Sequence, residues 1–218
     1  MKNISRSCKS IFNWFIFVKI AFLNRKIPQI VLIDANDSFV HNIKDALYQL
    51  GYPLKMLAYS DFTQAQILEA DALIFSPGPG HASEYSRWNE LLEALPPTFP
   101  VLGICLGFQV LASYYGASLN QLREVIHGQN HDCLQINEHP LWKGIPNRFE
   151  VGRYHSWEIK ATSLGDSLIP LAQTTDACLM AIAHRNRPHI GVQFHPESFM
   201  CPYGKQMFKN FIALIPWE

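Results

Sequence analysis

Short apolar runs alternate with helix-like segments through the first half of the chain, and this alternation restricts the fold most. Runs of this kind, rich in β-branched residues and stopped by polar or glycine-containing turns, are typical of strands buried in a parallel sheet. They lie at 29–35, 53–59, 71–76 and 100–104. The segments that favour helices follow them in turn, at 38–52, 63–70, 86–95 and 106–116. The pattern predicts an α/β fold with an open, mostly parallel sheet flanked by helices.

From about Leu119 the pattern changes to short, strand-like stretches separated by turns. They lie at 124–128, 132–136, 149–159, 168–174 and 178–185, and one more apolar run follows at 188–194. We expect short antiparallel strands added to one side of the sheet, and a closing amphipathic helix at 204–215. No repeat or linker interrupts residues 29–218, which predicts one domain.

Composition excludes several classes of protein. The chain has 218 residues, and its 18 Lys and Arg balance 18 Asp and Glu. It therefore lacks the basic field that nucleic-acid binding needs. The five cysteines are scattered and form no CxxC pair, which argues against a zinc site or a disulfide framework. We expect reduced thiols, a cytoplasmic protein, and no metal or cofactor.

Residues 1–28 stand apart from this pattern. A basic start and a short apolar stretch resemble a signal peptide, but Asn13 and Lys19 interrupt the stretch, which is short for a bilayer. An over-extended start or plain tail, an interfacial amphipathic segment and an export signal all stay open. We expect this extension to lie outside the fold, and we expect no membrane association.

Cys105 lies between Gly103 and Gly107, where a predicted strand ends and a predicted helix begins. This G-x-C-x-G spacing has the form of a nucleophile elbow, in which glycines allow a sharp turn that exposes the nucleophile. The helix N-terminus favours a thiolate, and the backbone N–H of Leu106 can stabilise an oxyanion. A buried structural cysteine is the alternative.

A cysteine nucleophile needs a base that later acts as an acid, and His195 is well placed for this. It follows the apolar run at 188–194, so it should lie at the same end of the sheet as Cys105. Glu197 can fix the tautomer of the imidazole and stabilise its charge. The three residues form a candidate catalytic triad, although His-Pro-Glu also occurs in plain surface turns.

Several motifs together resemble one family. Class I (triad-type) glutamine amidotransferases, with a flavodoxin-like fold, have motifs similar in order and spacing to SPGPG (76–80), GICLGFQ (103–109) and GVQFHPES (191–198). The small subunits (component II) of anthranilate synthase and aminodeoxychorismate synthase have segments similar to LIDANDSFVHNI (32–43), HGQ (127–129) and VGRYHSWEI (151–159). The likeness runs from about Gln29 to the C-terminus.

In this family a cysteine attacks the side-chain amide of glutamine, forms a glutamyl thioester and releases ammonia. The resemblance implies that Cys105 is the nucleophile, His195 the general base and acid, and Glu197 its orienting partner. It implies an oxyanion hole made by the backbone N–H groups of Gly78 and Leu106. It also implies substrate contacts from Gly80, Gln109 and the backbone of Ser156 and Trp157.

The chain departs from the family pattern at a few positions. Phe108 stands where His or Gln is usual, and Ala35 and Asn36 stand where Asn and Tyr are usual. The segment after Gly80 lacks the usual proline, and Gln129 replaces a lysine. These positions fall mainly where such subunits meet their synthase, so they concern the partner more than the chemistry.

The resemblance implies a glutaminase subunit that supplies ammonia to a separate chorismate-using synthase. Whether that partner makes anthranilate, aminodeoxychorismate or both stays open. A stand-alone γ-glutamyl or amide hydrolase with the same triad is one alternative, and the RYHS segment argues against it. A catalytically silent regulatory subunit is the other, and the presence of Cys105, His195 and Glu197 argues against that.

Overall fold

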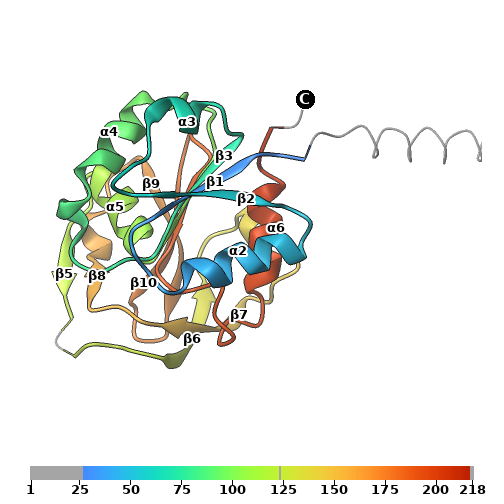
Figure 1. The fold of residues 1–218 in the computed structure, drawn as a ribbon. Coiled ribbons are helices and arrows are strands. Elements are labelled where there is room, and N and C mark those ends of the chain that lie inside the picture. Colours follow the sequence, from blue (N-terminus) through green and yellow to red (C-terminus); the bar gives the residue numbers. More distant parts are fainter. Residues whose placement is uncertain (1–26, 123, 217–218) are drawn as a thin grey trace, which may run out of the picture.

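The computed structural model describes residues 27–122 and 124–216 (Figure 1). The expectations for the N-terminal extension concern residues that, up to position 26, lie outside this described part. Within it, a nine-stranded sheet forms the centre of the molecule. The predicted α/β class is confirmed.

Parallel strands make one half of the sheet. Their spatial order is β2 (Leu54–Ala58), β1 (Ile30–Asp34), β3 (Ala72–Phe75), β4 (Val101–Ile104) and β11 (His189–Val192). The antiparallel strands continue it as β10 (Leu179–His184), β9 (Leu168–Thr174), β6 (Gln129–Gln135) and β7 (Arg148–Arg153). A separate antiparallel pair joins β5 (Leu119–Gln121) and β8 (Trp157–Ile159).

Helices cover both faces of the sheet because the strands are apolar on both sides. In β1, Ile30 and Leu32 face one apolar cluster, while Val31 and Ile33 face the other. The first cluster includes residues of α2 (Val40–Gln49) and α6 (Gly204–Ile212). The second includes residues of α3 (Gln64–Leu68), α4 (Ser86–Ala94) and α5 (Leu106–Tyr114). Short 3₁₀ turns occur at η1 (Ala82–Glu84), η2 (Pro140–Trp142) and η3 (Ala161–Ser163).

The structure corrects the prediction for two stretches of the second half. Residues 124–128 form an irregular loop and not a strand, and Gly128, with a φ of 66°, interrupts the extended backbone just before β6 begins at Gln129. The loop is instead tied by the N–H groups of Ile126 and Gly128 to the carbonyls of His155 and Arg153. The run predicted at 149–159 is divided between β7 and β8.

Candidate active site

Cys105 occupies a strained turn between β4 and α5. Its φ of 51° and ψ of −100° are rare for a residue with a side chain, and such strain costs about 1–3 kcal/mol. The backbone holds the turn in place, because Cys105 N donates to Val192 O at 2.9 Å and Gly107 N donates to Ser76 O at 3.2 Å. This is the geometry of a nucleophile elbow.

The two glycines of the elbow allow close packing. A Cβ atom on Gly107 would lie 2.4 Å from the carbonyl oxygen of Phe75, and one on Gly103 would lie 2.5 Å from the backbone of Gly107. Neither position has room for a larger residue. The spacing read from the sequence is therefore a packing requirement of the turn that presents Cys105.

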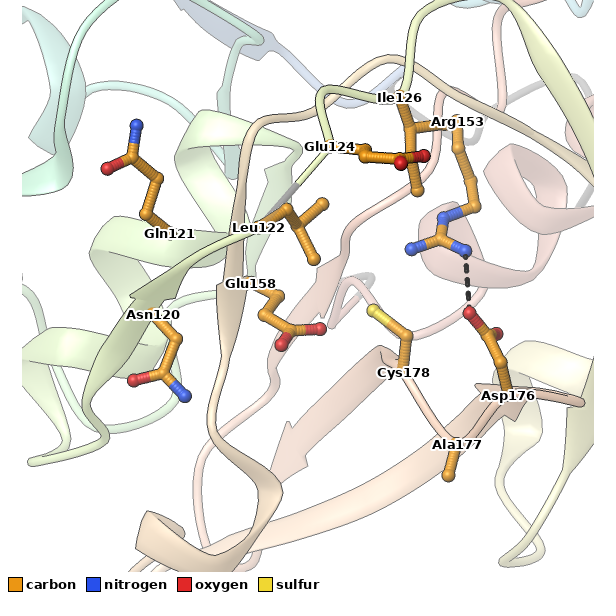
Figure 2. Close-up of a pocket in the computed structure, with 10 residues that line it drawn as sticks. All are labelled: Asn120, Gln121, Leu122, Glu124, Ile126, Arg153, Glu158, Asp176, Ala177 and Cys178. Atoms are coloured by element: carbon orange, nitrogen blue, oxygen red, sulfur yellow. Dashed lines mark hydrogen bonds and ion pairs between the residues drawn. The ribbon is translucent and has the colours of Figure 1, made fainter.

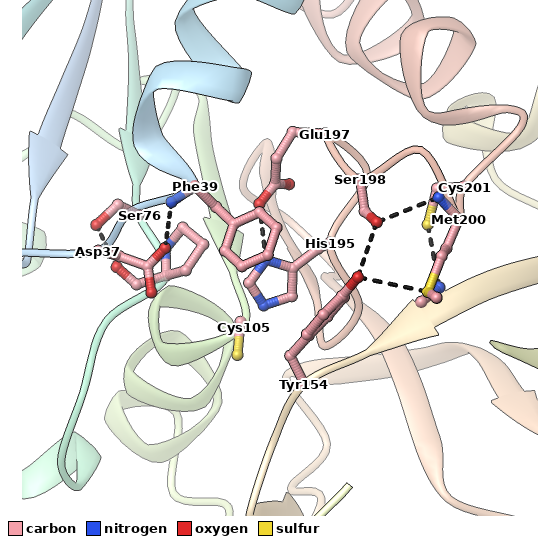
Figure 3. A network of polar contacts seen from close by, with 12 residues as sticks. Asp37, Phe39, Ser76, Cys105, Tyr154, His195, Glu197, Ser198, Met200 and Cys201 are labelled. Atoms are coloured by element: carbon pink, nitrogen blue, oxygen red, sulfur yellow. Dashed lines mark hydrogen bonds and ion pairs between the residues drawn. The ribbon is translucent and has the colours of Figure 1, made fainter. Parts of the chain in front are cut away.

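His195 lies three residues beyond the end of β11, and β11 pairs with β4, so it reaches the same sheet edge as Cys105. Its Nδ1 is 2.7 Å from Oε1 of Glu197, and the two side chains are 3% and 0% exposed. The imidazole packs against both Phe39 and Tyr154, whose ring centroids are each 4.9 Å away and lie 5.0 Å from each other. Figure 3 shows Cys105 beside the part of the imidazole that faces away from Glu197.

The charge state of His195 follows from these neighbours. Burial disfavours the imidazolium, but attraction by Cys105 and the hydrogen bond and charge of Glu197 outweigh it, so the pKa of His195 is well above its usual value. Its Nε2 has no hydrogen-bond partner among the residues that the structure describes. A protonated imidazole in this position can attract a thiolate and later give its proton to a leaving group.

Gly78 and Leu106, the expected oxyanion-hole residues, lie against each other. A Cβ atom on Gly78 would come within 2.6 Å of Leu106 Cδ2 and 2.7 Å of Ala35 Cβ, so glycine is needed for this approach. Leu106 is the first residue of α5, and its N–H therefore has no acceptor within the helix. The two segments that carry these N–H groups thus meet beside Cys105.

The expected substrate-binding residues border the same region. Gln109 Nε2 donates to Trp157 O at 3.0 Å, which brings the segment 156–157 next to α5. Ser156 O accepts from Leu122 N at 2.9 Å, so this segment is also tied to the end of β5. Gly80 has a φ of 78° and lies against the Glu84 carboxylate, next to His81.

Some residues at the site were not predicted from the sequence. Gln193 is fully buried, and its Nε2 donates to the Cys105 sulfur at 3.7 Å. It is a polar residue at the end of an apolar run, and that was the one available signal. Phe39 and Tyr154 had no such signal, because their contacts with His195 depend on how three distant segments meet (Figure 3).

A cavity that Cys105 and His195 do not line lies elsewhere on the molecule. Its volume is about 800 Å³, and Figure 2 shows the side chains that line it. Arg153 borders it with only 1% of its surface exposed, and its Nη1 is 3.5 Å from Asp176 Oδ2. In the described ranges, no cluster of three or more His, Cys, Asp or Glu residues is arranged to hold a metal ion. Nor does any helix of that part have the length and apolar character needed to cross a membrane.

Comparison with known proteins places the chain in a family. The sequence profile described as "Glutamine amidotransferase class-I" matches residues 31–214. The aminodeoxychorismate/anthranilate synthase component 2 of Bacillus subtilis is 35% identical over 185 residues, which cover 84% of this chain and 95% of the relative. Anthranilate synthase component II of Haloarcula marismortui is also 35% identical over 185 residues, covering 84% and 96%.

A solved structure agrees with this assignment at the level of the fold. A glutamine amidotransferase from Methylobacillus flagellatus superposes with a TM-score of 0.71 at 17% identity, covering 89% of this chain and 97% of that chain. The family profile matches most of this chain. The chain in turn aligns with nearly the whole length of the two relatives described above. This chain is a member of the class-I glutamine amidotransferase family.

Proposed function

We propose that this chain hydrolyses glutamine to glutamate and ammonia, with Cys105 as the nucleophile, His195 as the base and acid, and Glu197 as its orienting partner. The observation that carries the proposal is the buried His195–Glu197 pair, at 2.7 Å, beside a cysteine on a strained turn. A structural cysteine would need neither the strain nor the charged partner.

The reaction follows from these positions. The Cys105 thiolate forms a C–S bond to the side-chain amide carbon of glutamine, and the carbonyl oxygen becomes an oxyanion facing the N–H groups of Gly78 and Leu106. The imidazolium of His195 gives its proton to the amide nitrogen, the C–N bond breaks, and ammonia leaves. His195 then takes a proton from water, whose oxygen attacks the thioester and displaces the thiolate, so that glutamate is released.

The substrate is held by the segments around Gln109. In this proposal Gly80 and Gln109 contact glutamine, and the backbone of Ser156 and Trp157 binds its α-amino and α-carboxylate groups. The hydrogen bond from Gln109 to Trp157 O supports this, because it fixes one substrate-binding segment against the helix that begins at the nucleophile.

We also propose that a separate chorismate-using synthase receives the ammonia, and that the amidotransferase domain spans 29–218 with residues 1–28 outside it. The relatives named as component II support a partner of this kind. So does Phe199, which is 89% exposed only two residues after Glu197 and offers an apolar side chain to a partner. The partner produces anthranilate, aminodeoxychorismate, or each with a different large subunit.

The experiment mixes the purified chain with glutamine, chorismate and each candidate large subunit in turn, and follows glutamate and the aromatic product. Anthranilate or aminodeoxychorismate names the partner, and both products mean a shared subunit. Glutamate release at full rate without any partner would favour a stand-alone hydrolase. A Cys105→Ala chain that still releases glutamate would refute the nucleophile.

A further inference from the structure

We propose that Gln193 is a further catalytic residue of this site, whose side-chain amide donates a hydrogen bond to the Cys105 sulfur and stabilises the attacking thiolate. The inference rests on the glutamine hydrolysis proposed above. It goes beyond the triad and the oxyanion hole, because Gln193 acts on the nucleophile itself.

The backbone places Gln193 firmly. It directly follows β11, and its N–H donates to Met180 O on β10 at 2.8 Å. The side chain is fully buried, and its Nε2 lies 3.7 Å from Cys105 Sγ, within hydrogen-bond range for a large sulfur atom. Because the Gln193 side chain is itself excluded from water, its donor exchanges little with solvent, and a hydrogen bond from it to a thiolate is strong.

The orientation of the amide is fixed by its neighbours. The carbonyl oxygen of Trp157 can only accept, so Gln109 must turn its NH₂ group toward it, at 3.0 Å. The second N–H of that group meets Oε1 of Gln193 at 3.1 Å. Gln193 therefore presents its own NH₂ group, and not its oxygen, to the sulfur.

A second chain of hydrogen bonds holds the same carbonyl. His155 Nδ1 donates to Trp157 O at 2.8 Å, and its Nε2 accepts from Arg153 Nε at 3.1 Å. Burial and the Arg153 charge lower the pKa of His155 to about 4, so it stays neutral with its proton on Nδ1. A guanidinium can only donate and a carbonyl can only accept. Only one assignment of the imidazole protons and amide orientations therefore satisfies every hydrogen bond in this network.

This network connects the substrate to the nucleophile. The segment 156–157, which we propose binds the α-groups of glutamine, is joined through Gln109 and Gln193 to the Cys105 sulfur. The titratable groups beside Cys105 are His195 and, behind it, Glu197. Gln193 itself does not titrate, so its hydrogen-bond donor is present across the whole pH range in which a thiolate forms.

The test replaces Gln193 by Glu and, separately, by Met. Glu has nearly the same shape and places an oxygen where the NH₂ group faced the sulfur, whereas Met removes the donor without adding charge. Iodoacetamide alkylation is measured at the Cys105 peptide by mass spectrometry across pH, and glutamate release is measured with the activating partner. Gln206→Glu on α6 is the matched control outside the network.

We expect alkylation and kcat to fall about 10-fold to 100-fold in both variants at neutral pH, as for a lost hydrogen bond to a charged group, while KM changes less. The alkylation profile should move to higher pH, further with Glu than with Met. Folded variants that react at the wild-type rate would overturn the proposal, as would a change in KM alone. If the wild-type chain releases no glutamate, the proposed function fails, and alkylation still decides the role of Gln193.

Discussion

Replacing Glu197 by Gln tests whether the buried carboxylate sets the charge of His195. The distance from His195 Nδ1 to Glu197 Oε1 is 2.7 Å, and both side chains are excluded from water. A hydrogen bond to a charged group contributes about 1.5–3 kcal/mol, and removing one partner of a buried ion pair costs about 3–5 kcal/mol. At about 1.36 kcal/mol per factor of ten, this range predicts a fall in kcat of about one to nearly four orders of magnitude.

The pH dependence gives the same substitution a second readout. Glu197 favours the imidazolium, so its loss lowers the pKa of His195, and the protonated acid is depleted at a lower pH than in the wild type. The assay is glutamate release across the neutral and alkaline range, with the activating partner present. Glu150→Gln, an exposed carboxylate on β7, is the control. A Glu197→Gln chain with wild-type kcat and an unshifted profile would refute the reasoning.

Three further predictions concern stability and assembly. Cys105→Gly should be inactive but no less stable than Cys105→Ala in urea unfolding. Glycine relieves about 1–3 kcal/mol of backbone strain at this φ of 51°, which offsets its entropy cost of roughly 1 kcal/mol. If Cys105→Gly were less stable than Cys105→Ala by more than that entropy cost, the strain would be contradicted. Burial lowers the pKa of His189 to about 3, so the neutral imidazole stabilises the fold above the pKa that His189 has in the unfolded chain. As the pH falls below that unfolded pKa, this stabilisation is lost by about 1.4 kcal/mol per pH unit. His189→Gln should therefore flatten the acid dependence of the free energy of unfolding. Phe199→Ser should weaken binding to the large subunit in calorimetry and leave thermal unfolding of the isolated chain unchanged, and equal affinity would remove Phe199 from the interface.

The parts of the site that depend on short-range order could be predicted from the sequence. The elbow needs only the spacing of Gly103, Cys105 and Gly107, and the His195–Glu197 contact spans two residues. The parallel strands were also predictable, since their apolar runs are buried on both faces. In these cases the determining interactions lie within a few positions of one another.

The remaining contacts depend on tertiary arrangement. Gln193 meets Gln109 across 84 positions, and the side-chain orientation that matters is decided by a backbone carbonyl at Trp157. The loop at 124–128 has a strand-like composition, but two of its N–H groups pair with the carbonyls of Arg153, the last residue of β7, and of His155 just after it. No local pattern encodes either result.

The pairing of β11 with β4 also determines when the enzyme can become active during synthesis. β4 ends at Ile104. Of its two neighbours in the sheet, β3 precedes it in the chain, but β11 is formed only by residues 189–192. A growing chain therefore carries Cys105 for more than 80 further residues before His195 can reach it. Throughout that interval the nascent protein has the proposed nucleophile without its proposed proton donor, so under the proposed mechanism nearly the whole described fold must be translated before glutamine can be hydrolysed.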